Sequence, residues 1–124
     1  TYAGIPLTHR KFASSVVFVT GHEDSEKKKE DVRWKKLAKS TDTIVIMMGL
    51  ARISKICKQL SEGGMEKNTP VAVIQDGTTS KQKMITGTIS NIAQKVKQSK
   101  IKPPSIIIIG KVVSLSKTIG WRKK

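Results

Sequence analysis

The sequence predicts an α/β domain: a mixed sheet of about five strands with helices on both of its faces. Short, β-branched apolar blocks that end in glycine or a turn are typical of buried strands. Between them, apolar residues recur at helical spacing. The chain has 124 residues, of which 37% are hydrophobic, which suits one domain with one core. The predicted order is strand, helix, strand, helix, hairpin, helix, strand.

The first strand is predicted over residues 16–19, where the sequence reads VVFV and is soon followed by Gly21. Residues 23–33 mix acids and lysines and are interpreted as a solvated loop. This loop leads into a short helix over residues 31–39. The inner face of that helix is expected to carry Trp34, Leu37 and Ala38.

The second strand is predicted over residues 43–49, which are apolar on both faces. Continuous apolar strands belong to sheets that are covered on both sides. From residue 50 the spacing becomes helical, and Gly63-Gly64 ends the helix because glycine tolerates the left-handed cap conformation. The inner face of this helix is expected to hold Leu50, Ile53, Ile56, Cys57 and Leu60.

A hairpin follows, with strands over residues 71–75 and 82–89 joined by a turn at Asp76-Gly77. A third helix is predicted over residues 90–99, before Pro103-Pro104 interrupts the pattern. The run of four isoleucines that follows predicts the last strand, which we expect to continue to Val113.

The charge of the chain points to an anionic partner. The net charge is +15, and residues 78–124 contain eleven lysines and arginines without one acidic residue. A positive field speeds encounter with anions but does not choose between nucleic acid, a membrane surface and a polyanionic metabolite. Aromatic residues are not interleaved with the basic ones before Trp121, which weakens the case for single-stranded nucleic acid.

Several other classes are disfavoured. No stretch of about 18 uninterrupted apolar residues predicts a membrane span, and the first residues do not resemble a signal peptide. The single cysteine, Cys57, is interpreted as a core residue and favours a reducing, cytoplasmic setting. Two histidines, His9 and His22, are too few and too far apart for a metal site.

Three short segments are candidate binding elements. Met48-Gly49 and Asp76-Gly77-Thr78 each follow a predicted buried strand, and ligands of α/β sheets bind beyond the carboxyl ends of strands. For Met48-Gly49, spacing alone favours an ordinary strand-to-helix turn with a core methionine, whereas an ordinary hairpin turn explains Asp76-Gly77 equally well. Thr8-His9-Arg10 offers three hydrogen-bonding side chains, and arginine binds carboxylates with two parallel hydrogen bonds. The chain contains no complete catalytic motif.

The sequence resembles the C-terminal domain of uroporphyrinogen-III C-methyltransferases, within the wider family of tetrapyrrole methylases. The resemblance is carried by GIPLTHR at residues 4–10, MGL at 48–50 and PVAVIQDGT at 70–78, with further matches at residues 14–16, 19–22, 82, 87–88, 103–110, 112–113 and 121. It implies a two-domain enzyme, usually a homodimer, with S-adenosylmethionine in the cleft between the domains. Residues 1–124 are then expected to be the C-terminal domain, and the N-terminal domain with its glycine-rich cofactor loop is absent from this sequence.

The resemblance also implies roles for individual residues. Met48 would contact the adenosyl group of the cofactor and Gly77 the adenine edge, with Thr78 and Ala72 as further lining residues. Arg10, Thr8 and His9 would face the carboxylates of uroporphyrinogen III, a polycarboxylate tetrapyrrole that is methylated twice to give precorrin-2 for sirohaem or cobalamin. Met47 departs from the tyrosine that the family commonly has there. The alternatives are another enzyme of this fold, such as a precorrin or diphthine methylase, or a basic nucleic-acid-binding module.

Overall fold

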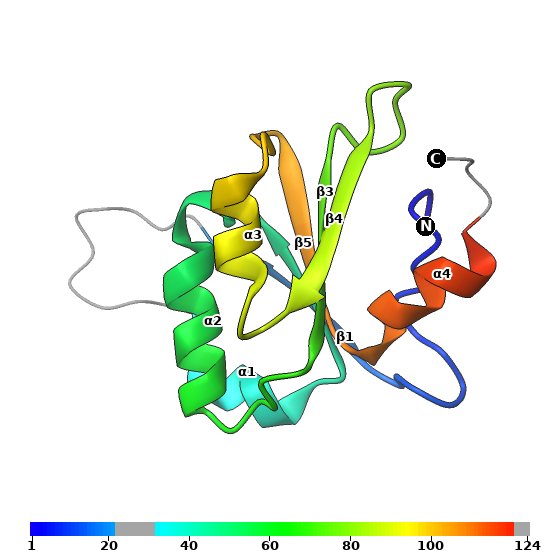
Figure 1. Ribbon diagram of the computed structural model, residues 1–124. Helices are drawn as coiled ribbons and strands as arrows, with labels where there is room; N and C mark the ends of the chain where they lie inside the picture. Colours follow the sequence, from blue (N-terminus) through cyan, green and yellow to red (C-terminus); the bar gives the residue numbers. More distant parts are fainter. Residues whose placement is uncertain (22–31, 121–124) are drawn as a thin grey trace.

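A computed structural model describes residues 1–21 and 32–120, which form a five-stranded sheet flanked by helices (Figure 1). In the described ranges, none of the helices combines the length and the apolar character needed to cross a membrane. The elements are β1 (Val16–Thr20), α1 (Trp34–Ser40), β2 (Thr43–Met47), the 3-10 helix η1 (Leu50–Arg52), α2 (Ile53–Glu62), β3 (Pro70–Gln75), β4 (Lys83–Thr88), α3 (Ile92–Gln98), β5 (Ser105–Ile109), the 3-10 helix η2 (Lys111–Leu115) and α4 (Ser116–Ile119).

The order of the strands in the sheet is β1-β2-β5-β3-β4. Only β1 and β2 are paired in parallel, and the other three neighbouring pairs are antiparallel. The isoleucine-rich β5 therefore lies in the centre, antiparallel to both β2 and β3. As a result β2 and β3 run in the same direction and end at the same edge of the sheet.

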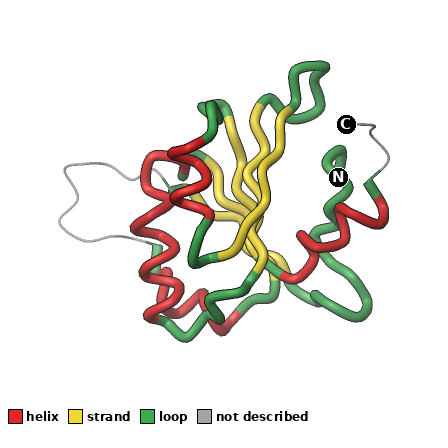
Figure 2. The backbone as a smooth tube through the Cα atoms, in the orientation of Figure 1, coloured by secondary structure: helices red, strands yellow, loops and turns green. Residues whose placement is uncertain are grey.

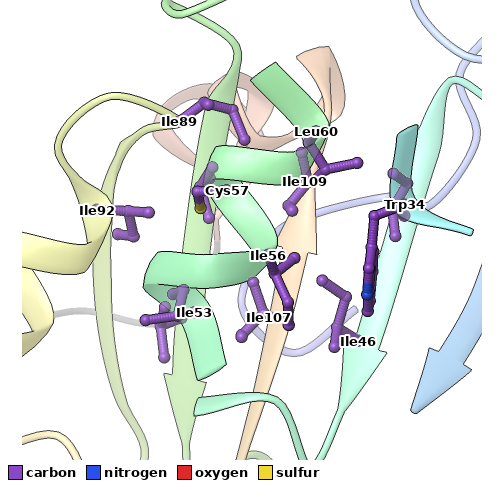
Figure 3. Packing of buried hydrophobic residues seen from close by; sticks show 13 residues of the cluster. Trp34, Ile46, Ile53, Ile56, Cys57, Leu60, Ile89, Ile92, Ile107 and Ile109 are labelled. Carbon is purple, nitrogen blue, oxygen red and sulfur yellow. The ribbon is translucent and has the colours of Figure 1, made fainter. Parts of the chain in front are cut away.

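The first face of the sheet is covered by α1, α2 and α3 (Figures 1 and 2). Every second residue of a strand points to this side, which is the period expected of a pleated sheet. The apolar side of α2 packs against these residues, as Figure 3 shows for Ile53, Ile56, Cys57 and Leu60. Trp34 of α1 closes the same core near Ile46. The predicted inner faces of the first two helices are thereby confirmed.

The second face is covered by the N-terminal segment together with η2 and α4 (Figure 1). Ile5 and Ala13 from the N-terminal segment are buried with Val112 and Val113 of η2. They pack on a second set of strand residues, namely Ala72, Ile74 and Ile108. The sequence prediction of a mixed sheet with helices on both faces is confirmed, although an irregular segment covers much of this side.

The end of the last strand differs from the prediction. The strand was expected to reach Val113, but β5 ends at Ile109 and the 3-10 helix η2 begins at Lys111. Gly110 has a φ of +147°, and a Cβ atom there would lie 2.6 Å from the carbonyl oxygen of Asp42. This backbone bend turns Val112 and Val113 away from the sheet and into the second core. The short helix α4 was not predicted at all.

The remaining elements follow the sequence prediction closely. The helix α2 ends at Glu62, and Gly64 takes the positive φ of +101° that its position after the helix suggested. The β3–β4 hairpin is confirmed by its antiparallel register. Some predictions fall outside the described residues. These are most of the predicted loop over residues 23–33, the predicted helix start at residue 31, and the residues His22 and Trp121.

Candidate functional site

An open cleft of about 880 Å³ lies at the edge where β2 and β3 end. Its walls come from three places: the residues after β2, the turn between β3 and β4, and the start of β5. The sheet order explains this grouping, because β2 and β3 end on the two sides of the first residues of β5. The lining residues are Met47, Met48, Leu50, Ala51, Ile74, Asp76, Gly77, Thr79, Pro103, Pro104, Ser105 and Ile106.

The wall after β2 is shaped by close packing of two glycines. Gly21, after β1, donates its N–H to the carbonyl oxygen of Met47 at 2.7 Å. A Cβ atom on Gly21 would lie 2.4 Å from the Cα of Gly49, so only glycine fits there. Met48 lies between these contacts with a φ of +55°, and the residue is 66% exposed. The backbone thus turns sharply and presents Met48 at the cleft.

The opposite wall is the turn that joins β3 to β4. Asp76 and Thr78 both have positive φ values, of 50° and 71°. Two side chains hold this backbone: the Thr79 hydroxyl donates to the Asp76 carbonyl oxygen at 2.7 Å, and the N–H of Thr78 donates to Gln82 Oε1 at 2.8 Å. Gly77 has open space around it, since the nearest atom to an added Cβ would be Ile74 Cγ2 at 3.6 Å. The turn therefore offers an accessible main-chain rim.

The structure brings Met48 and Gly77 into one cleft, as the sequence prediction required. Two other predicted lining residues are placed differently. Thr78 is exposed in the turn, but its neighbours Gly77 and Thr79 line the cleft instead. Ala72 is completely buried in the second core, two residues inside β3 from Ile74, so its side chain is not available to a ligand.

Thr8, His9 and Arg10 lie in and before a tight turn on the N-terminal segment. The N–H of His9 donates to the Ala13 carbonyl oxygen at 2.8 Å, and the imidazole stacks on Phe12 with a centroid distance of 5.0 Å. Thr8 and Arg10 are exposed. None of the three predicted residues lines the cleft.

The position of this turn is fixed through Ser14, which follows it. The N–H and the hydroxyl of Ser14 donate to Asp42 Oδ2 at 2.9 and 3.1 Å, just before β2 begins. The N–H of Ser14 is the main reason why the pKa of the Asp42 carboxyl is lowered from its usual value, with the Ser14 hydroxyl next. The turn therefore lies at the edge where β1 and β2 begin. It sits on the second face of the sheet, to which Ile74 and Ile106 of the cleft also point.

Sequence reasoning missed the third wall of the cleft, residues 103–106. It predicted that Pro103-Pro104 interrupts the helical pattern but gave no reason to place these prolines beside Met48. The pairing of β5 between β2 and β3 supplies that reason, and one sequence does not determine the order of strands in a sheet. Leu50, Ala51 and Thr79 also line the cleft and could have been expected as neighbours of predicted residues.

The cleft is suited to holding a ligand and carries few reactive groups. Apolar side chains line most of it, and the polar contributions come from main-chain atoms, hydroxyls and the carboxylate of Asp76. In the described part of the chain, no group of histidine, cysteine and carboxylate side chains could hold a metal ion. Cys57 lies in the first core, where burial raises the pKa of its thiol to about 11. Its interpretation as a core residue is confirmed.

Comparison with known proteins places this architecture among related chains. The sequence profile of the family described as Tetrapyrrole (Corrin/Porphyrin) Methylases matches residues 1–93. The chain is 46% identical over 121 residues to a siroheme synthase of Nitrosomonas eutropha, covering 98% of this chain and 25% of that protein. It is 44% identical to the S-adenosyl-L-methionine-dependent uroporphyrinogen III methyltransferase of Methanosarcina barkeri, covering 98% and 48%.

A solved structure agrees with the fold. The uroporphyrin-III C-methyl transferase of Thermus thermophilus, complexed with S-adenyl homocysteine, superimposes with a TM-score of 0.77 at 26% identity. The match covers 92% of this chain and 49% of that one. The chain thus spans between a quarter and a half of the length of the relatives that it matches.

Proposed function

Because this chain belongs to the tetrapyrrole (corrin/porphyrin) methylase family, we propose that it is the C-terminal half of an enzyme that methylates uroporphyrinogen III. The methyl donor would be S-adenosylmethionine and the product precorrin-2, which leads to sirohaem and cobalamin. The single cleft that holds both Met48 and Gly77 carries this proposal. The names of the relatives support the choice of substrate.

The residues of the cleft fit the proposed cofactor. Adenine has two flat, apolar faces, and the flexible thioether of Met48 packs well on such a surface. The open main chain at Gly77 allows close approach to the edge of a ring, and its N–H and C=O groups can recognise that edge. When bound, S-adenosylmethionine supplies an electrophilic methyl group. Methyl transfer to a carbon nucleophile needs chiefly alignment and exclusion of water, which agrees with a cleft that is lined mostly by apolar side chains.

The substrate would bind along the second face of the sheet, between the cleft and the opposite edge, where the turn that carries Arg10 lies. We assign Arg10 to the carboxylates of the tetrapyrrole, with Thr8 and His9 as hydrogen-bonding neighbours. All three precede β1 on the segment that covers this face, and Arg10 is exposed. The net charge of +15 favours the encounter with such a polyanion more than it favours final affinity.

The cleft would be completed by an N-terminal domain that carries a glycine-rich cofactor loop. The greater length of the relatives supports this, and the enzyme would act as a homodimer. We expect the 124 residues alone to bind S-adenosylhomocysteine poorly, because only one side of the site is present. The lone, buried Cys57 supports a reducing, cytoplasmic setting.

A test compares two variants in the complete protein that contains these residues. With uroporphyrinogen III and methyl-labelled S-adenosylmethionine, wild type should place label on the tetrapyrrole. Arg10→Ala should reduce use of the tetrapyrrole by at least about tenfold while the affinity for S-adenosylhomocysteine stays within about twofold. Gly77→Ala should show the reverse order of effects. Equal loss of both functions in both variants would contradict the assignment of the two sides.

Other outcomes would point to the alternatives. Labelling of a different tetrapyrrole, with none on uroporphyrinogen III, would indicate another reaction on the same scaffold. Tight binding to random-sequence DNA or RNA, with affinity that falls steeply as salt rises, would indicate a nucleic-acid-binding protein.

A further inference from the structure

Gln75 is a buried polar residue at the junction of two walls of the cleft. It is the last residue of β3 and is 4% exposed. Both ends of its side-chain amide are used. Nε2 donates to Asp76 Oδ2 at 2.9 Å, and Oε1 accepts the N–H of Lys102 at 2.9 Å. A buried amide satisfied at both ends holds its partners firmly, because leaving either group unpaired is costly.

The partners of Gln75 belong to different walls. Asp76 opens the β3–β4 turn, whereas Lys102 leads directly into Pro103 and Pro104. A main-chain bond reinforces the link, since the N–H of Asp76 donates to the Pro104 carbonyl oxygen at 3.1 Å. Gln75 does not line the cleft itself. Its side chain sits behind the two walls and joins them.

Asp76 needs such support because of its own backbone. A φ of +50° is unusual for a residue with a Cβ atom and costs roughly 1 kcal/mol or more. The neighbouring Gln75 amide constrains the direction of the Asp76 carboxylate, and this carboxylate is the charged group of the cleft lining. One side chain therefore contacts both Asp76 and the residue that precedes Pro103, in addition to the main-chain bond between Asp76 and Pro104.

We propose that Gln75 is a positioning residue for the bound S-adenosyl ligand: it orients the Asp76 carboxylate and sets the distance between the two walls. This inference rests on the proposed function of the cleft. It assigns Gln75 no contact with the ligand. For the ligand to bind, the amide of Gln75 must be the donor and the carboxylate of Asp76 the acceptor in the hydrogen bond between them.

Reversing that polarity provides the test. In the complete protein, Gln75→Glu keeps the size of the side chain but replaces its donor with a carboxylate that repels Asp76. The affinity for S-adenosylhomocysteine should fall by about tenfold or more. Asp76→Asn keeps an acceptor for Gln75 but removes the charge of the cleft lining, so its own affinity, whatever it is, serves as the reference for the double variant. The double variant Gln75→Glu with Asp76→Asn places an amide donor at residue 76 opposite the new carboxylate. Its affinity for S-adenosylhomocysteine should therefore recover to within about threefold of that of Asp76→Asn.

Gln98→Glu is the matched control, because it makes the same change at an exposed position at the end of α3. It should leave the affinity unchanged. A Gln75→Glu variant that binds as tightly as wild type would overturn the positioning role while leaving the proposed function intact. So would a double variant that is no better than Gln75→Glu. Absence of binding by wild type would overturn both.

A measurement on wild type removes the dependence on folding of the variants. The side-chain NH₂ hydrogens of Gln75 should exchange with solvent much more slowly than those of Gln98, and their NMR signals should shift when the ligand is added. If these hydrogens exchange as freely as those of Gln98, Gln75 is not held between the walls and the inference fails.

Discussion

At the scale of single residues, the cleft depends on places where a side chain would not fit. Gly21 and Gly49 touch behind Met48, and the main chain on both sides prevents easy adjustment. We predict that Gly21→Ala destabilises the chain by about 1–3 kcal/mol, because the new methyl group would overlap the Gly49 backbone. Urea unfolding measures this. Gly77→Ala, which adds the same group in open space, should change the free energy of unfolding by less than about 1 kcal/mol. Equal effects would contradict the packing described.

The buried thiol of Cys57 makes a prediction about pH. Burial raises its pKa from 9.0 to about 11 in the folded chain. The unfolded chain therefore loses this proton first, so the stability of wild type should fall as pH rises from about 9 to about 11. Cys57→Ala removes this contribution but not those of the lysines. The difference between the two unfolding free energies should shift against wild type by up to roughly 2 kcal/mol across that range. A constant difference would show that the thiol ionises as readily in the folded chain.

At the scale of elements, the strands were predictable because their β-branched blocks are buried on both faces, as Ile44, Val45 and Ile46 of β2 show. The helix α2 was predictable because its apolar residues recur on one side. The order of the strands was not, since nothing local in the four isoleucines before Gly110 places β5 between β2 and β3. The shared cleft of Met48 and Gly77 depends on that order. Their meeting could be hypothesised from the sequence, whereas the contribution of residues 103–106 could not.

Gly110 decides where β5 ends, and its replacement tests this. Alanine is strained at a φ of +147°, and its Cβ would lie 2.6 Å from the Asp42 carbonyl oxygen. We expect Gly110→Ala to lower the free energy of unfolding by about 2 kcal/mol or more. Lys111→Ala, at the exposed next residue, should stay within about 0.5 kcal/mol of wild type. If both variants unfold at the same urea concentration, the bend does not need glycine.

At the scale of the whole molecule, the charge of +15 is poorly compensated. Among pairs in which both residues are described, the structure gives one ion pair, Lys35 Nζ to Glu62 Oε2 at 3.3 Å. Both side chains are well exposed, so the pair contributes little to stability. The folded chain gathers its lysines into a smaller volume than the unfolded chain does. Mutual repulsion therefore opposes folding, while the same positive field would speed the encounter with the anionic substrate proposed above.

Screening this repulsion should stabilise the chain. Raising sodium chloride from about 0.02 M to about 0.5 M shortens the Debye length well below the size of the domain, so the urea midpoint should rise. Replacing Lys97 and Lys100, both exposed, with glutamine should raise the midpoint at low salt and reduce the salt effect. Replacing the neutral Gln94 and Gln98 with alanine should leave the salt effect unchanged. A urea midpoint that falls as salt rises would contradict this prediction. It would mean that attractive charge pairs outweigh the repulsion between lysines in the folded chain.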